Sequence, residues 1–182
     1  MSKYELDANQ AVLLVIDLQE KLMAAMPTAE KVIRNARLLL QLAHTCAVPV
    51  IVTEQYPRGL GRTVPEIQEV LGEHTMIEKL TFSAMVPELQ EKMEQWGRKQ
   101  VVVVGTETHV CVFQTVRDLV EEGFEVQVVR DAVASRFKEN FENGLALMAG
   151  VGAVVTNTET VVFDVLKIAG TPEFREISKL IK

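Results

Sequence analysis

The chain has 182 residues, of which 48% are apolar and 24% charged, so we expect one domain, residues 1–182. Its formal net charge is −6 and its lysines and arginines are spread along the chain, which argues against a nucleic-acid or anionic-membrane partner. No apolar run reaches the roughly 18–20 residues that a membrane span needs, and the polar N-terminus is unlike a secretory signal. The chain has two cysteines, Cys46 and Cys111. Together these features favour a cytoplasmic protein with reduced thiols.

Short apolar runs alternate with longer stretches of helical periodicity. The apolar runs predict strands at 11–17, 48–54, 75–80, 100–105, 124–131 and 152–157. The periodic stretches predict helices at 31–46, 86–97, 110–122 and within 138–150, with a short helix from Val64 and a helical C-terminus. This alternation indicates right-handed βαβ units, so we expect an α/β fold with a parallel sheet covered by helices on both faces.

Polar residues follow several of these apolar runs, at the sheet edge where open parallel sheets bind ligands. Asp17 ends the first run, and Lys79 ends the third. A carboxylate partly removed from water is suited to accept a proton, but by position alone Asp17 is equally a helix cap. A single lysine is usually a solvated charge, and the functional alternative for Lys79 is to steady a neighbouring anion.

Cys111 follows the fourth apolar run, in the first turn of the next predicted helix. A helix N-terminus lowers the pKa of a thiol and offers backbone N–H groups to an oxyanion, so Cys111 is either a nucleophile or a buried packing residue. Cys46 is interpreted as packing. His109 lies two residues before Cys111 and is expected to line the pocket. No metal-ligand spacing, dinucleotide signature or phosphate loop is found, so no metal or cofactor is expected.

Six stretches resemble the isochorismatase-like cysteine hydrolase superfamily in order and spacing, over nearly the whole chain. They are "LLVIDLQEKL", "TEQYPRGLGRTVPEI", "EKLTFSA", "VVGTETHVCVFQT", "VVRDAVASR" and "GAVVTNTETVVFDVL". The resemblance implies a three-layer Rossmann-like fold with six parallel strands in the order 3-2-1-4-5-6. It implies a catalytic triad of Asp17, Lys79 and Cys111. It also implies a cis peptide at Thr106–Glu107 and an oxyanion hole made by the backbone N–H groups of Glu107 and Cys111.

The implied mechanism is nucleophilic. Asp17 accepts the thiol proton, Lys79 holds the charges in place, and the thiolate attacks a carbonyl carbon. Nicotinamidases of this superfamily bind a metal through an Asp-x-His pair, but the matching stretch "TEQYPRGLG" contains no histidine. True isochorismatases typically lack the cysteine. The sequence therefore favours a metal-independent hydrolase of a small amide, imide or carbamoyl substrate, without a cofactor.

Two other functions stay open. One is isochorismatase-type vinyl ether hydrolysis by Asp17 without the thiol, and the other is a non-catalytic binding protein of the same fold. The side chains expected to contact a small-molecule substrate are Gln19, Glu54, Gln55, Tyr56, Phe82, His109 and Phe113. The alternative for several of them is a surface or core position. The resemblance also implies a homo-oligomer, a dimer or larger.

Overall fold

Six strands form one parallel sheet in the computed structural model, which describes residues 2–181. The strands are β1 (Ala11–Ile16), β2 (Val50–Gln55), β3 (Thr75–Lys79), β4 (Gln100–Thr106), β5 (Glu125–Ala134) and β6 (Val154–Thr156). They lie in the order β3-β2-β1-β4-β5-β6, and each neighbouring pair is parallel. The expected fold class, number of strands and strand order are therefore confirmed.

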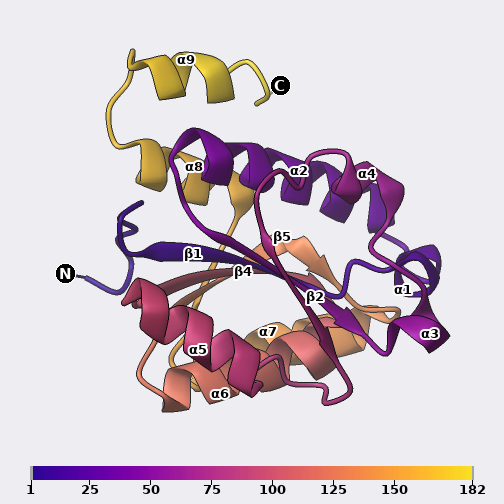
Figure 1. Ribbon diagram of the computed structural model, residues 1–182. Helices are drawn as coiled ribbons and strands as arrows, with labels where there is room; N and C mark the ends of the chain where they lie inside the picture. The colour runs from indigo at the N-terminus through magenta and orange to yellow at the C-terminus, as the bar shows by residue number, and fades with distance from the viewer. Residues whose placement is uncertain (1, 182) are drawn as a thin grey trace.

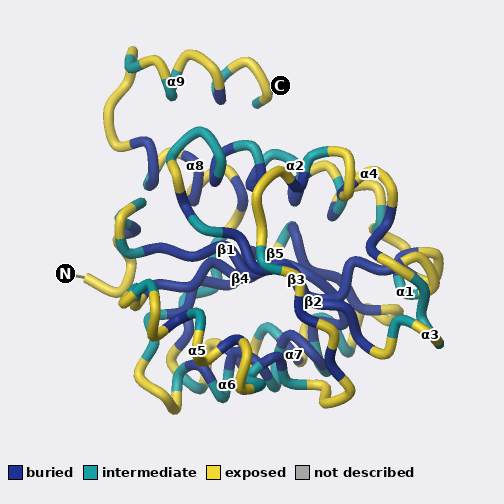
Figure 2. The backbone as a smooth tube through the Cα atoms, viewed as in Figure 1, coloured by how far each residue is buried: buried dark blue, intermediate teal, exposed yellow. Residues whose placement is uncertain are grey.

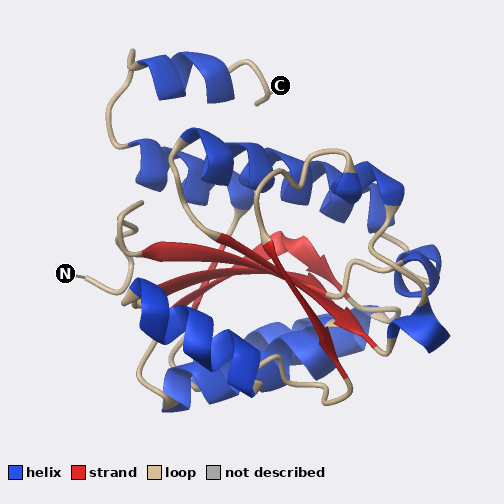
Figure 3. Ribbon diagram, in the orientation of Figure 1, coloured by secondary structure: helices blue, strands red, loops and turns tan. Residues whose placement is uncertain are grey.

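Helices cover both faces of this sheet (Figures 1 and 3). They are α1 (Glu20–Ala24), α2 (Ala29–Thr45), α3 (Pro57–Leu60), α4 (Pro65–Gln68), α5 (Pro87–Trp96), α6 (Phe113–Glu121), α7 (Lys138–Gly150), α8 (Thr158–Leu166) and α9 (Pro172–Ile177). Helices α2, α4, α8 and α9 lie on one side of the sheet, and α5, α6 and α7 lie on the other. Within residues 2–181, no helix combines the length and the apolar character needed to cross a membrane.

The central strand β1 supplies side chains to two separate cores. Leu13 and Val15 pack in the core beneath α2, whereas Val12, Leu14 and Ile16 pack in the core beneath α5 and α6. Every residue of β1 is buried, because a central parallel strand has helices on both faces. Figure 2 shows the result as a buried sheet between two more exposed helical layers. Each fully buried valine, leucine or isoleucine side chain stabilises the fold by about 1.5–3 kcal/mol.

Some local structure differs from the sequence-based expectation. Helices α1 and α3 were not predicted, because helices of 5 and 4 residues are too short to show a periodic pattern. The helix expected from Val110 begins instead with a π-helical turn, η1 (Thr108–Val112). In this turn, the N–H of Val112 donates to the carbonyl of Glu107 at 3.2 Å, five residues back. The regular α-helix starts only at Phe113, after Cys111.

Gly105 allows β4 to approach β1 closely at the carboxyl edge of the sheet. It lies opposite Ile16 and has a φ of +137°. A Cβ atom at this position would lie 2.0 Å from the carbonyl oxygen of Ile16. The close approach sets Asp17, which follows β1, beside Thr106 at the end of β4. The Thr106 hydroxyl then donates to the Asp17 carbonyl at 2.7 Å.

We predict that Gly105→Ala lowers the free energy of unfolding by more than about 3 kcal/mol, because the added methyl group meets fixed backbone at a left-handed φ. Gly97→Ala is the matched control, since Gly97 has a φ of +62° but no atom lies within 4 Å of the point that its added Cβ would occupy. It should cost only the conformational strain, about 1–2 kcal/mol. Urea denaturation measures both values, and equal losses would contradict a close-approach role for Gly105.

Candidate active site

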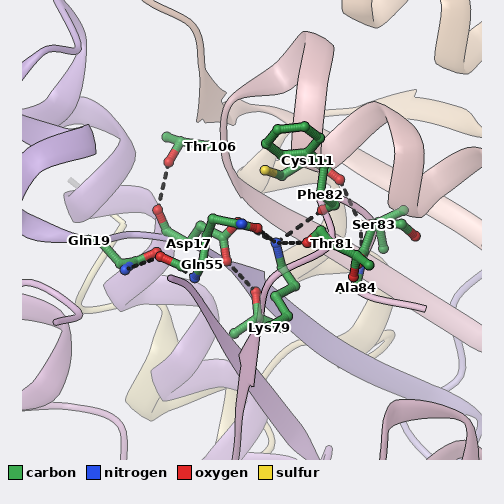
Figure 4. Close-up of polar contacts among 12 residues, drawn as sticks. Asp17, Gln19, Gln55, Lys79, Thr81, Phe82, Ser83, Ala84, Thr106 and Cys111 are labelled. Atoms are coloured by element: carbon green, nitrogen blue, oxygen red, sulfur yellow. Dashed lines mark hydrogen bonds and ion pairs between the residues drawn. The ribbon is translucent and has the colours of Figure 1, made fainter. Parts of the chain in front are cut away.

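Lys79, the last residue of β3, is at the centre of a buried polar cluster (Figure 4). Its Nζ donates to Asp17 Oδ2 at 2.7 Å and to Gln55 Oε1 at 2.8 Å. It also donates to the carbonyl oxygens of Phe82 at 3.0 Å and Thr81 at 3.3 Å. The side chains of Lys79 and Asp17 are both 0% exposed. The ammonium group is therefore held by oxygen atoms from three segments of the chain.

Asp17 follows β1 directly and is held on both its side chain and its backbone. Its φ is +51°, an uncommon conformation for a residue other than glycine. The Thr53 hydroxyl donates to Asp17 Oδ1 at 2.7 Å, while Lys79 occupies the other carboxylate oxygen. The Asp17 backbone N–H donates to the Thr53 carbonyl, and its own carbonyl accepts from Thr106. Asp17 is thus fixed in position with neither carboxylate oxygen free of a partner.

Cys111 lies in the π-helical turn η1 and is 6% exposed. Burial, the Asp17 charge and a hydrogen bond to Asp17 raise the pKa of its thiol to about 12, although Lys79 and the Glu107 backbone N–H act in the opposite direction. The expectation of an easily ionised thiol at a helix N-terminus is therefore wrong for the free protein. Desolvation and a neighbouring carboxylate outweigh the favourable charges. At neutral pH the thiol is protonated and faces Asp17.

The turn before Cys111 places a backbone donor near the sulfur. The Thr106–Glu107 peptide is cis, and the N–H of Glu107 is close enough to the Cys111 sulfur to favour the thiolate. The Glu107 carboxylate points to Arg136, whose Nε lies 2.8 Å from Glu107 Oε1. Burial acts to raise the pKa of Glu107, but the hydrogen bonds and charge of Arg136 outweigh it and keep this pKa below its usual value. The pair anchors the turn to the end of β5.

Two glutamines, Gln19 and Gln55, support the cluster through hydrogen bonds. Gln19 Oε1 accepts from the Gln55 backbone N–H at 2.7 Å, and Gln19 Nε2 donates to the carbonyls of Gln55 and Gly61. Gln55 Oε1 accepts from Lys79, and Gln55 Nε2 donates to the Leu80 carbonyl at 2.8 Å. The side-chain amides of both residues are engaged by protein groups. Gln55 contacts Lys79 directly, and Gln19 fixes the backbone of Gln55.

Glu54 lies apart from the other candidate residues. Successive strand residues point to opposite faces, so Glu54 faces away from Thr53 and Gln55. Its carboxylate accepts from Arg62 at 2.7 Å and from both the backbone N–H and the hydroxyl of Thr63. Burial acts to raise the pKa of Glu54, but the hydrogen bonds from Thr63 and Arg62 keep it below its usual value. The Glu54 side chain therefore fastens the loop after β2.

The remaining candidate residues lie in segments that follow β2, β3 and β4. Tyr56 and Phe82 are 51% and 53% exposed and follow β2 and β3. His109 is half-buried in η1, with Nδ1 3.0 Å from the Ser135 hydroxyl. Phe113 packs in part against the core beneath α6. Tyr56 and Phe82 thus have aromatic surface available to a ligand, whereas Phe113 also has a packing role.

Two threonines that sequence analysis did not single out complete the cluster. Thr53 donates to Asp17, and it is the one polar residue before Glu54 in the run "VPVIVTE", which is a usable signal. Thr115 donates to the Cys111 carbonyl at 2.6 Å and accepts from the Ala84 N–H at 2.8 Å. Its position four residues after Cys111 places it one helical turn away. Thr115 thereby ties the loop after β3 to the Cys111 turn.

Cysteine pairs and metal-ligand clusters are absent from residues 2–181. Cys46 and Cys111 are both free thiols. Cys46 is half-buried, and burial together with the charges of Glu173 and Glu176 raises its pKa. No group of three or more His, Cys, Asp or Glu side chains in the described chain is arranged to hold a metal ion.

Comparison with known proteins shows the family to which the chain belongs. The model of the isochorismatase domain matches residues 11–160. The chain is 38% identical over 179 residues to the secreted isochorismatase effector Isc1 of Phytophthora sojae, covering 96% of this chain and 85% of that protein. It is 38% identical over 178 residues to isochorismatase domain-containing protein 2 of Danio rerio, covering 97% and 89%.

Solved structures agree with this grouping. A Caenorhabditis elegans structure described as MAR1 ribonuclease matches with a TM-score of 0.93 and 36% identity over 97% of this chain and 92% of that chain. YcaC of Pseudomonas aeruginosa, solved with hexane-2,5-diol and covalent acrylamide, matches with a TM-score of 0.89 and 25% identity over 99% and 93%. YcaC of Escherichia coli, described as an octameric hydrolase of unknown specificity, has a TM-score of 0.84 and 25% identity over 96% and 95%. The chain therefore belongs to the isochorismatase-like hydrolase family.

Proposed function

We propose that the protein is a metal-independent cysteine hydrolase that cleaves a small amide, imide or carbamoyl substrate through a thioester acyl-enzyme intermediate. The observation that carries the proposal is the buried cluster in which the Cys111 thiol faces the Asp17 carboxylate, itself paired with Lys79 at 2.7 Å. A nucleophile beside a base that a third group orients is the arrangement that covalent catalysis requires.

The first step is an internal proton transfer. Asp17 takes the proton from the Cys111 sulfur as the sulfur adds to the substrate carbonyl carbon. The thiol need not be ionised beforehand, so its pKa of about 12 in the free protein is compatible with catalysis. Lys79 stays within reach of both acids and keeps one positive charge beside whichever of them is anionic.

Asp17 and Cys111 also carry out the later steps, in which the C–N bond breaks and water releases the acyl group. The carbonyl oxygen becomes an oxyanion and accepts hydrogen bonds from the backbone N–H groups of Glu107 and Cys111. Protonated Asp17 gives its proton to the leaving nitrogen as the C–N bond breaks. Asp17 then takes a proton from water, which adds to the thioester. The C–S bond breaks and the sulfur regains a proton from Asp17, which restores the starting state.

The proposed substrate contacts come from the segments that follow β2, β3 and β4. We assign direct contact to Tyr56, Phe82, His109 and Phe113, and a supporting role to Gln19 and Gln55, whose amides already bind protein groups. Glu54 is assigned to the loop rather than the substrate. The P. aeruginosa relative was solved with covalent acrylamide, so a protein of this fold carries a group that reacts with a small electrophilic amide.

The family name supports a second candidate function, vinyl ether hydrolysis by Asp17 without the thiol. The name of the C. elegans structure adds RNA as a substrate to be tested, although a net charge of −6 is unfavourable for binding a polyanion. The octameric E. coli relative supports assembly of this chain into a homo-oligomer.

Removal of the nucleophile tests the proposal. We predict that Cys111→Ala lowers turnover of the best amide, imide or carbamoyl substrate by at least about a thousandfold, because no other group can form the acyl-enzyme. Cys46→Ala is the matched control and should retain activity. Intact-mass spectrometry of the wild type should show a transient acyl adduct on Cys111. If no amide gives an adduct on Cys111 and cleavage of isochorismate survives Cys111→Ala, the second candidate function is supported instead. If cleavage of RNA survives, RNA hydrolysis is supported.

The raised thiol pKa gives a prediction with a definite sign. Asp17→Asn removes a charge and a charged hydrogen-bond acceptor that raise the Cys111 pKa, and it leaves the Lys79 charge that lowers it. The pKa should therefore fall, and iodoacetamide labelling of Cys111 at pH 8 should be at least about tenfold faster in the variant, while amide turnover is lost. In the wild type, labelling should keep rising with pH up to about 11 without a plateau near pH 8.

Peptide mass mapping follows both cysteines in one experiment. Cys46 reports on the fold, because it is half-buried in a different part of the molecule and should be labelled at the wild-type rate in Asp17→Asn. Slower labelling of Cys111 in Asp17→Asn, or a plateau near pH 8 in the wild type, would mean that Asp17 already activates the thiol in the free protein.

A further inference from the structure

A cavity of about 680 Å³ opens at the carboxyl edge of the sheet, beyond β5 and β6. It is lined by Pro27, Thr28, Lys31, Val32, Arg130, Asp131, Val133, Ser135, Lys138, Phe141, Glu142, Leu145 and Asn157. These residues come from the start of α2, from β5, from α7 and from the residue before α8. Helices α2 and α7 lie on opposite faces of the sheet, so the cavity spans its edge (Figure 1).

This cavity is separate from the triad. Asp17, Lys79 and Cys111 are not among its lining residues. The end of β5 stands between them, because Ser135 lines the cavity and its hydroxyl lies 3.0 Å from Nδ1 of His109, in the turn that carries Cys111. The volume is within the range of about 300–1,000 Å³ that is usual for small-molecule sites. The cavity can therefore hold a ligand while the triad is free.

The charges around the cavity favour an anion. Lys31, Arg130 and Lys138 supply three positive charges against the two carboxylates of Asp131 and Glu142. Asp131 is already engaged, because its Oδ1 accepts from both the N–H and the hydroxyl of Thr158 at 2.8 Å. This excess of positive charge stands out in a chain whose net charge is −6.

The cations themselves are available. Lys31 and Arg130 form no ion pair within the part of the chain that the structure describes. Lys138 lies 3.5 Å from Glu142, but both side chains are mostly exposed, so this pair is weak and easily exchanged. A ligand carboxylate could therefore replace water around two cations without breaking a strong contact.

The walls of the cavity are apolar below the charged rim. Val32 and Val133 are buried, and Phe141 and Leu145 are half-buried beside them. We propose that this cavity binds a small organic monoanion, a carboxylate with an apolar ring or chain. The carboxylate pairs with Lys31 and Arg130, and the apolar body lies against Phe141 and Leu145. Specificity would come from the carboxylate and the apolar body together, since either part of the ligand alone makes few contacts.

Benzoate is the probe, with the full chain carrying Cys111→Ala so that chemistry at the triad is excluded. Isothermal titration calorimetry should show benzoate binding, with weaker binding of benzyl alcohol, which keeps the ring but lacks the charge, and of acetate, which keeps the charge but lacks the ring. Affinity for benzoate should fall as the sodium chloride concentration rises. Because no turnover is measured, this test can fail while the proposed hydrolase activity stands, and the reverse.

Variants of the rim give effects of opposite sign. The double variant Lys31→Gln, Arg130→Gln should weaken benzoate binding by at least about fivefold, whereas Glu142→Gln should strengthen it, because it removes a repelling carboxylate and frees Lys138. Lys92→Gln removes the positive charge of a half-buried lysine outside this cavity and should leave the affinity unchanged. A merely structural role of the rim residues would not predict opposite signs for the two changes.

Several results would overturn the proposal. Equal affinity for benzyl alcohol and benzoate would rule out recognition of the charge. Equal losses of benzoate affinity in Lys92→Gln and in the rim double variant would show that the ligand responds only to the overall charge of the protein. Absence of any binding up to about 10 mM benzoate would show that the cavity takes no such ligand.

Discussion

The buried ion pair between Lys79 and Asp17 constrains the rest of the site. Removing both charges from water costs several kcal/mol per ion, and the attraction between them offsets this only if their remaining hydrogen-bonding groups are also satisfied. The carboxyl edge of the sheet meets this demand with Thr53 on Asp17 and with Gln55 on Lys79. Loss of either charge alone would leave the other buried and unpaired.

Proton transfer within this cluster keeps the net charge of the buried site constant. Before the transfer, Lys79 is paired with the Asp17 carboxylate, and the Cys111 thiol is neutral. After it, Lys79 faces the thiolate and Asp17 is neutral. Ionisation of Cys111 to solvent would instead add an uncompensated negative charge, and this difference explains a thiol pKa raised to about 12 beside a lysine. A high resting pKa and a reactive thiol are thus consistent within the proposed mechanism.

The sequence was sufficient to predict the strands, their parallel arrangement and, through the family resemblance, their order. It also predicted that Asp17, Lys79 and Cys111 follow strands that meet at one edge. It did not predict the direction of the Cys111 pKa shift, because that depends on Asp17, which is 94 residues away in the chain and within hydrogen-bonding reach in space. That Glu54 and Gln55 point to opposite faces of the sheet was available from strand alternation, but the π-helical turn was not, since no residue pattern marks its hydrogen bonds.

The hydrogen bonds that Lys79 already makes decide which substrate groups can bind beside it, a neutral carbonyl or an anion. Its ammonium group has three hydrogens and already faces four oxygen atoms within 3.3 Å, so no N–H is left to bind an anionic substrate group. The proposed triad is therefore suited to a neutral carbonyl, to whose developing oxyanion the backbone N–H groups of the Cys111 turn can donate hydrogen bonds. Recognition of a permanent anion needs cations that are free to pair with it, and within residues 2–181 neither Lys31 nor Arg130 forms an ion pair. The Ser135–His109 contact joins the wall of the cavity to the turn that carries Cys111.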